Sequence, residues 1–283
     1  MKRLTGLSRN AAITREDFLE MKNAGIDCIE VSPVAEQYDT VLDLPRLKAL
    51  ADEFGITLRS FHQRFGDEFD ISSLDENVRK GAVAYYKKFI PECAAVGIKI
   101  HVVHASFEPI EDDERQARIE AAKRSLAELA EYAAGYDAVI AVEDLPRSCL
   151  GNSGADMLAL TSADERLKIC FDTNHLLGEN IHDFIKATAH KYITVHFSDY
   201  DFINERHWLP GEGDINWCEL MDTLDEMGYN GPILYELGFA APWSIERPRD
   251  LTAFDFKRNH VELEGRLELT KIGERKPNIG MWK

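Results

Sequence analysis

The segment Cys170-Phe171-Asp172-Thr173-Asn174-His175 runs from apolar residues straight into a carboxylate and an imidazole. Three further apolar runs end in the same way: 138–142 before Glu143, 192–195 before His196 and 232–235 before Glu236. The carboxyl ends of parallel strands meet at one rim of a barrel, which would bring these polar side chains together. The pattern therefore predicts a polar site at that rim.

Strand-like and helical segments alternate along the chain. Eight apolar runs are expected to be strands: 3–8, 28–33, 57–62, 99–105, 138–143, 167–172, 192–197 and 231–236. Helical stretches such as 77–96, 114–134 and 214–227 separate them, and glycines at 25, 55, 97 and 228 stand where a helix end needs a left-handed residue. This repeat predicts an α/β fold, a (β/α)8 TIM barrel with a single domain over residues 1–283.

The competing architecture is an open doubly wound sheet. No GxGxxG motif follows the first strand, which disfavours a dinucleotide-binding fold of that kind. Near the end of the chain, residues 252–269 have the amphipathic pattern of an eighth outer helix. Residues 273–283 are expected to be poorly anchored.

Composition limits the class of partner. The 283 residues include 33 Lys and Arg against 50 Asp and Glu, a formal charge of −17 that repels nucleic acid. No apolar run approaches the 18 or so residues of a membrane span, and no signal peptide is apparent at the N-terminus, so we expect a cytoplasmic protein with no membrane partner. The five cysteines are scattered without a CxxC pair, and we expect them to be reduced core residues.

The candidate ligands are the polar residues that end the strands. Two Glu, one Asp and one His, at Glu143, Asp172, His196 and Glu236, suit one divalent ion such as Mn²⁺, Mg²⁺, Co²⁺ or Zn²⁺. Any one of them alone is as well explained by a helix cap or a hydrogen-bonded structural residue. Four together at one rim favour a cation, because buried carboxylates without one are costly.

Other histidines are sorted by position. His62 and His104 end the third and fourth strands, and His175 follows the sixth. His101 lies three residues before His104 and therefore points to the opposite face of its strand. The histidines at 182, 190 and 260 fall in helical segments and are expected on solvated faces.

A loop of defined conformation is expected after the seventh strand, over residues 199–217. It contains two glycines and a proline, as loops of defined shape do, and it ends at Asp214, which is suited to cap the next helix. His207 and Trp208 are unusual residues for an ordinary surface turn.

These motifs resemble the xylose-isomerase-like barrel superfamily over nearly the whole chain. Its marks here are FDTNH at 171–175, HFSD at 196–199 and HWLPGEGDINW at 207–217. By that resemblance, Glu143, Asp172, His196 and Glu236 match the four metal ligands of the ketose epimerases, and His175 matches a histidine that contacts substrate. The second glutamate that those epimerases carry shortly after the strand-five ligand is absent, and Asp144, Arg147 and Cys149 occupy that neighbourhood.

The resemblance extends to the type IV apurinic endonucleases, which bind three zinc ions. Their ligand pattern can be traced over nine positions: His62, His104, Glu143, Asp172, His175, His196, Glu205, His207 and Glu236. Two features depart from that branch: Glu205 stands where it has Asp, and the loop from His196 to Glu205 is shorter.

The resulting hypothesis is a metal-dependent isomerase or epimerase of a small ketose or sugar phosphate. Glu143 and Glu236 would move a proton α to a carbonyl through an enediolate. The expected substrate contacts are His62, His104, Arg147, His175, His207 and Trp208. An inosose-type dehydratase, the endonuclease and a non-catalytic binding protein are the alternatives, and a homo-oligomer stays open.

Overall fold

The structure is a computed structural model that describes residues 2–33, 42–277 and 279. Eight parallel strands close into a barrel in chain order. They are β1 (Thr5–Asn10), β2 (Cys28–Ser32), β3 (Thr57–His62), β4 (Ile100–His104), β5 (Val139–Glu143), β6 (Lys168–Asp172), β7 (Tyr192–Phe197) and β8 (Ile233–Tyr235). The predicted (β/α)8 TIM barrel is confirmed.

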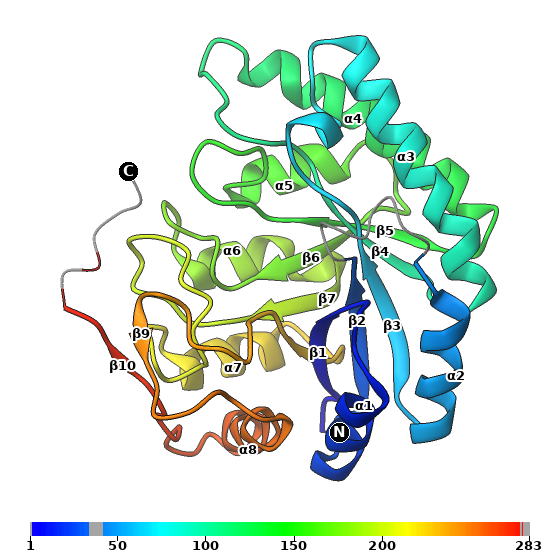
Figure 1. The fold of residues 1–283 in the computed structure, drawn as a ribbon. Coiled ribbons are helices and arrows are strands. Elements are labelled where there is room, and N and C mark those ends of the chain that lie inside the picture. The colour runs from blue at the N-terminus through cyan, green and yellow to red at the C-terminus, as the bar shows by residue number, and fades with distance from the viewer. Residues whose placement is uncertain (1, 34–41, 278, 280–283) are drawn as a thin grey trace.

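Helices surround the strands (Figure 1). They are α1 (Arg15–Ala24), α2 (Leu44–Phe54), α3 (Glu76–Ala95), α4 (Arg115–Ala134), α5 (Gly154–Thr161), α6 (Ile181–Thr188), α7 (Trp217–Glu226) and α8 (Ala253–Glu264), with short 3-10 helices η2 (Asp67–Phe69) and η3 (Ala189–Lys191). All four predicted helix-end glycines have positive φ, at 81°, 69°, 87° and 74° in chain order. At these four positions a left-handed glycine therefore lets the chain turn from the helix toward the next strand.

The barrel interior is a packed layer. Ile100, Val102, Ala141 and Cys170 form one buried cluster, separate from the large core between the strands and the helices. Because side chains alternate along a strand, the residues two positions further on, including His104, Glu143 and Asp172, lie on the same face at the mouth. Packing below the mouth thus fixes the floor of the site.

The C-terminal region corrects two expectations. Strand β10 (Glu274–Arg275) pairs with β9 (Ile245–Glu246), and the Gly273 N–H donates to Glu212 Oε1 at 2.7 Å, so the chain is anchored through residue 275 rather than loose from 273. Residues 278 and 280–283 lie outside the described part. The last outer helix ends at Glu264, because the chain turns at Gly265, and does not reach residue 269.

Three local expectations are also wrong. Helix α7 begins at Trp217 with Asn216 as its N-cap, and Asp214 instead pairs with Arg275 at 2.6 Å. Cys218 is exposed on the first turn of α7, whereas the other four cysteines are buried and free. His260 is only 3% exposed because its face of α8 packs inward.

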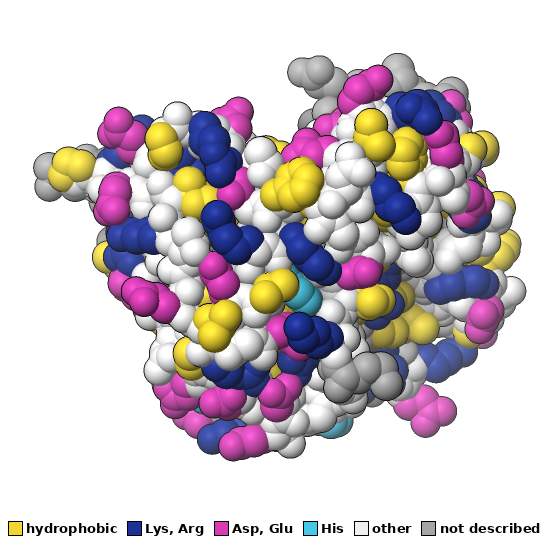
Figure 2. Space-filling model, turned by 90° about the horizontal axis from the view of Figure 1, so that it is seen from below, with side chains coloured by type: hydrophobic (Ala, Val, Ile, Leu, Met, Phe, Trp, Pro, Cys, Tyr) yellow, Lys and Arg dark blue, Asp and Glu magenta, His cyan; other side chains and the backbone are white. Residues whose placement is uncertain are grey.

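Acidic and basic side chains are interspersed on the face shown in Figure 2. Much of the charge is engaged in ion pairs, among them the fully buried pair of Arg247 and Glu212 at 2.7 Å. No helix among the described residues is both long and apolar enough to cross a membrane.

Candidate metal centre and active site

Register brings the strand-end residues together. His104 is level with Glu143 across β4 and β5, and Asp172 is level with His196 across β6 and β7. Glu143, Asp172 and His196 have no exposed surface. The four predicted ligands, these three and Glu236, each offer an atom within 4.8 Å of the others.

His196 Nδ1 lies at the centre of the cluster. It is 2.8 Å from Glu143 Oε1, 3.2 Å from Glu236 Oε2 and 3.9 Å from Asp172 Oδ2. Burial opposes protonation of His196, yet the surrounding carboxylates raise its pKa well above the usual value. The carboxylates around the ring thus favour its protonated form.

The donor set fits a divalent ion. Asp172 Oδ2 is buried without a hydrogen-bond partner among the described groups, and burial together with the negative charges of Glu236 and Glu143 raises the pKa of Asp172 well above its usual range. The negative charge of the buried carboxylates is therefore not fully compensated by neighbouring groups, and a bound cation would stabilise it. Three carboxylates and one imidazole are ligands for Mn²⁺, Mg²⁺, Co²⁺ or Zn²⁺.

Two more histidines converge on the other oxygen of Glu143. His62 Nε2 lies 3.0 Å and His104 Nε2 lies 3.1 Å from Glu143 Oε2. The His62 Nδ1 atom is bonded to the Gln63 carbonyl at 2.8 Å, which directs Nε2 toward the carboxylate. Burial disfavours the charged form of His62, but the hydrogen bond and charge of Glu143 outweigh it and raise its pKa to about 9. The expectation that His104, not His101, faces the mouth is confirmed.

A second group forms beside the cluster, from His175, Glu205 and His207. His175 Nε2 is 3.0 Å from Glu205 Oε1. Both imidazoles are bonded through Nδ1 to backbone carbonyls, His175 to Asp144 at 2.6 Å and His207 to Glu236 at 3.0 Å. The carbonyl bonds require Nδ1 to carry the proton, so each Nε2 keeps a lone pair when the ring is neutral.

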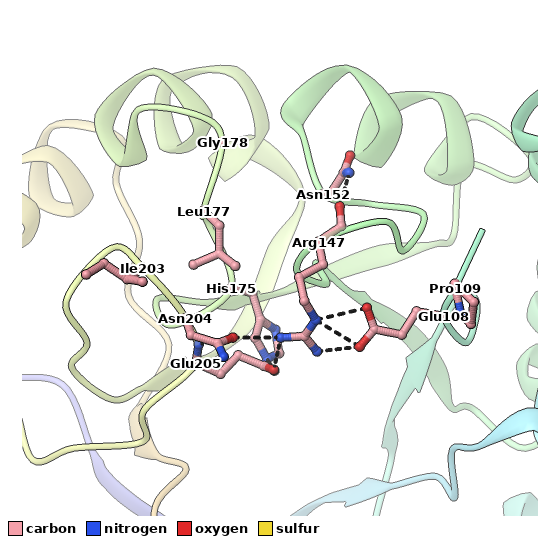
Figure 3. A pocket seen from close by; sticks show the side chains of 10 residues that line it. All are labelled: Glu108, Pro109, Arg147, Asn152, His175, Leu177, Gly178, Ile203, Asn204 and Glu205. Carbon is pink, nitrogen blue, oxygen red and sulfur yellow. Dashed lines mark hydrogen bonds and ion pairs between the residues drawn. The ribbon is translucent and has the colours of Figure 1, made fainter. Parts of the chain in front are cut away.

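Arg147 spans the pocket of about 800 Å³ next to this group (Figure 3). Its Nε donates to both oxygens of Glu108 at 2.9 Å, and Nη1 donates to Asn204 at 3.0 Å and to Glu205. The guanidinium therefore ties the loops after β4, β5 and β7 together. It is already fully engaged by protein groups, which is not what was expected of a substrate contact.

A family model of xylose isomerase-like TIM barrels matches residues 18–251. The chain belongs to this family. The D-psicose 3-epimerase of Ruminiclostridium cellulolyticum is 27% identical over 229 residues, covering 75% of this chain and 74% of that protein. The inosose isomerase of Halalkalibacterium halodurans is 30% identical over 158 residues, covering 49% of this chain and 55% of that protein.

Two solved structures share the fold of this chain. A D-tagatose 3-epimerase-like protein superposes with a TM-score of 0.78 at 22% identity, covering 94% of this chain and 99% of that one. The 3-keto-D-glucoside 4-epimerase from E. coli superposes with a TM-score of 0.74, also at 22% identity, covering 93% and 100%.

Within this xylose isomerase-like barrel, the loop over residues 199–217 is held by Asp199. Its carboxylate accepts from Trp217 Nε1 at 2.7 Å and from the Gly211 and Ile215 N–H groups at 2.8 and 3.2 Å. A Cβ at Gly213 would lie 2.0 Å from Asp199 Oδ1, so only glycine fits there. The backbone of Asp199 also pairs with that of Trp208, the residue that follows His207.

Trp208 lies in the interior of the loop and is not among the residues that line the pocket. It has no exposed surface, and its indole N–H donates to Ser244 at 2.9 Å. The residue is unusual in a turn because it fills the interior of the loop, and we leave it out of the substrate set.

Sequence reasoning missed three residues around the site. Phe65 stacks on His104 with ring centroids 4.4 Å apart, and Glu108 holds Arg147, yet both lie in loops without a recognisable motif. Glu30 is different, because it is a fully buried carboxylate in the apolar strand β2. An acid in such a run is a signal that the sequence did contain.

Proposed function

We propose that this protein is a divalent-metal-dependent epimerase or isomerase of a small ketose. The observation that carries the proposal is that Glu143 and Glu236 both lie against His196 Nδ1, at 2.8 and 3.2 Å, in a cluster that Asp172 completes. Relatives named as D-psicose 3-epimerases and an inosose isomerase support the same class of reaction.

The proposed reaction must remove a weakly acidic proton from carbon. A proton α to a carbonyl is too weakly acidic to leave unaided, and a divalent ion held by the four ligands would stabilise the negative charge of an enediolate. Glu143 and Glu236 are the carboxylates suited to take and return that proton. The hydrogen bonds from His62 and His104 fix the position of the Glu143 carboxylate.

An unphosphorylated sugar fits the pocket better than a sugar phosphate. Among the described residues that line the pocket of about 800 Å³, Arg147 is the only Lys or Arg, and its guanidinium is bonded to Glu108, Asn204 and Glu205. A phosphate dianion would have to displace two carboxylates to reach it.

A ketose panel in deuterated water tests the proposal. The metal-loaded protein is expected to place solvent deuterium on the carbon next to the carbonyl of its substrate. Glu143→Gln and Glu236→Gln retain an oxygen donor but lose a proton acceptor, so exchange should fall by at least ~100-fold in each. Metal content is measured in every variant. Normal exchange in both variants with metal bound would contradict the assignment of the two carboxylates.

One observation favours a second candidate, a phosphodiester hydrolase with three metal ions. His62, His104 and Glu143 form one flanking group, and His175, Glu205 and His207 form another, each with ligand atoms within 4.8 Å of one another. Counting bound metal ions separates the two functions: the epimerase requires one ion per chain and the hydrolase three.

A further inference from the structure

Glu30 lies beneath the metal centre in the barrel interior. It is in the middle of β2, has no exposed surface, and its Oε2 accepts a hydrogen bond from Ser60 Oγ at 2.7 Å. Its other oxygen, Oε1, is 2.9 Å from His196 Nε2. Glu30 therefore approaches His196 from the side opposite to Glu143 and Glu236, which lie against Nδ1.

The two atoms depend on each other for a partner. Neither Glu30 Oε1 nor His196 Nε2 makes a hydrogen bond of good geometry to any described group, and the two atoms lie 2.9 Å apart without the alignment of a hydrogen bond. A buried carboxylate oxygen or ring nitrogen left without a partner costs free energy. The remaining neighbour is Cys170, whose pKa burial raises well above its usual value, so it is a neutral thiol and only a weak acceptor.

We propose that Glu30 is a positioning residue for the metal centre, and that it holds the remaining proton of His196 on Nε2 so that Nδ1 presents its lone pair to the ion. The inference rests on the metal centre of the proposed function. His196 Nε2 and Glu30 Oε1 are 2.9 Å apart, within hydrogen-bond distance, so a turn of the imidazole would aim its N–H at Oε1, and Ser60 keeps the carboxylate in place for it. Such carboxylate–histidine–metal arrangements fix the ring and make the ligating nitrogen more basic.

Ion affinity tests the proposal without reference to turnover. Mn²⁺ or Co²⁺ affinity is measured by competition with a chelator for the wild-type protein and four variants. Glu30→Gln retains the shape but loses the charge, and Glu30→Leu removes the acceptor; we expect ~10-fold and ~100-fold weaker binding, the range for such outer partners. Ser60→Ala should weaken binding by a few-fold through the carboxylate that it holds.

Thr194→Val is the matched control. Thr194 lies on β7 two residues before His196, is fully buried, and its hydroxyl has no hydrogen-bond partner among the described groups. The substitution alters the same interior layer without touching the Glu30 contact, and the hydroxyl that it removes has no hydrogen-bond partner to lose, so affinity should stay within ~3-fold of wild type. Circular dichroism and thermal melting show which variants fold.

A second readout identifies the ring nitrogen that carries the proton. In the zinc-loaded protein, ¹⁵N imidazole spectra should show His196 protonated at Nε2 and ligating through Nδ1. Coordination through Nε2, or wild-type affinity in a folded Glu30→Gln or Glu30→Leu variant, would overturn the inference. A wild-type protein that binds no ion would instead overturn the proposed function and, with it, the inference that rests on it.

Discussion

Glu143 is the residue on which the site depends, because three imidazoles share its two oxygens. His196 approaches one oxygen at 2.8 Å, while His62 and His104 approach the other at 3.0 and 3.1 Å. Burial alone would raise the pKa of Glu143, but these histidines lower it well below the usual value. A carboxylate kept ionised inside the barrel is what both a metal ligand and a proton acceptor require.

Substitution of Arg147 should weaken substrate binding more than turnover. Arg147→Met should release Glu108 from Glu205 and loosen the pocket wall, raising KM by about 10-fold with kcat changed by less than ~3-fold, the pattern of lost ground-state binding. The side chain is 39% exposed, so unfolding free energy should change by only about 1 kcal/mol, as for exposed ion pairs. Steady-state kinetics on the substrate from the panel measure both constants.

The matched control is Arg166→Met. Arg166 pairs with Asp164 on the surface before β6, away from the residues that line the pocket. Its loss should leave KM and kcat at wild-type values. An equal effect of the two substitutions would show that Arg147 has no special part in the pocket.

The sequence predicted correctly which polar residues come together at the ends of the strands. Glu143, Asp172, His196 and Glu236 meet because parallel strands end at one rim, and that geometry follows from the order of the strands. Arg147 and Trp208 were placed in the substrate set by loop position alone. Their real partners, Glu108 and Ser244, come from distant loops whose contacts no periodicity encodes.

The side chains of strand β4 alternate between the barrel interior and the surrounding helices. His104 points to the mouth beside Glu143, whereas His101 packs outward, its ring centroid 6.0 Å from that of Phe61 and its Nδ1 bonded to Gln63 at 3.1 Å. Alternation was enough to sort the two histidines from sequence. The sequence pattern of α8 did not place His260 correctly. This helix buries several polar residues along with its apolar ones, and His260 is among them.

His101 makes stability depend on pH. Burial lowers its pKa from 6.5 to about 4, so the unfolded chain binds a proton between those values that the folded protein does not. Stability from this residue is full above pH 6.5 and is lost as pH falls toward 4, by on the order of 3 kcal/mol. Denaturant unfolding at several pH values should show His101→Gln with a flatter acid dependence than wild type. Parallel curves for the two proteins would contradict this assignment.

At the scale of the whole molecule, charge separates the two candidate functions. The net charge is −17, and the loop over 199–217 contains five acidic residues against one arginine. Two of these acidic residues are paired with arginines from outside the loop, Glu212 with Arg247 and Asp214 with Arg275, which lowers the negative charge of the loop. These pairs engage Arg247 and Arg275 as well, so neither arginine is free to contact a phosphate backbone.

The last prediction follows from that balance. A nuclease must hold a duplex that has one charge per ~1.7 Å of axis, and its affinity falls steeply with salt. We expect no incision of an abasic-site duplex at ~0.15 M salt, where screening extends only ~8 Å. Zinc loading should not change the result, since metal ions cleave only a strand that the surrounding surface has captured. Salt-sensitive, zinc-dependent nicking at enzymic rates would reverse the ranking of the two functions and make His62, His104, Glu205 and His207 ligands of additional ions.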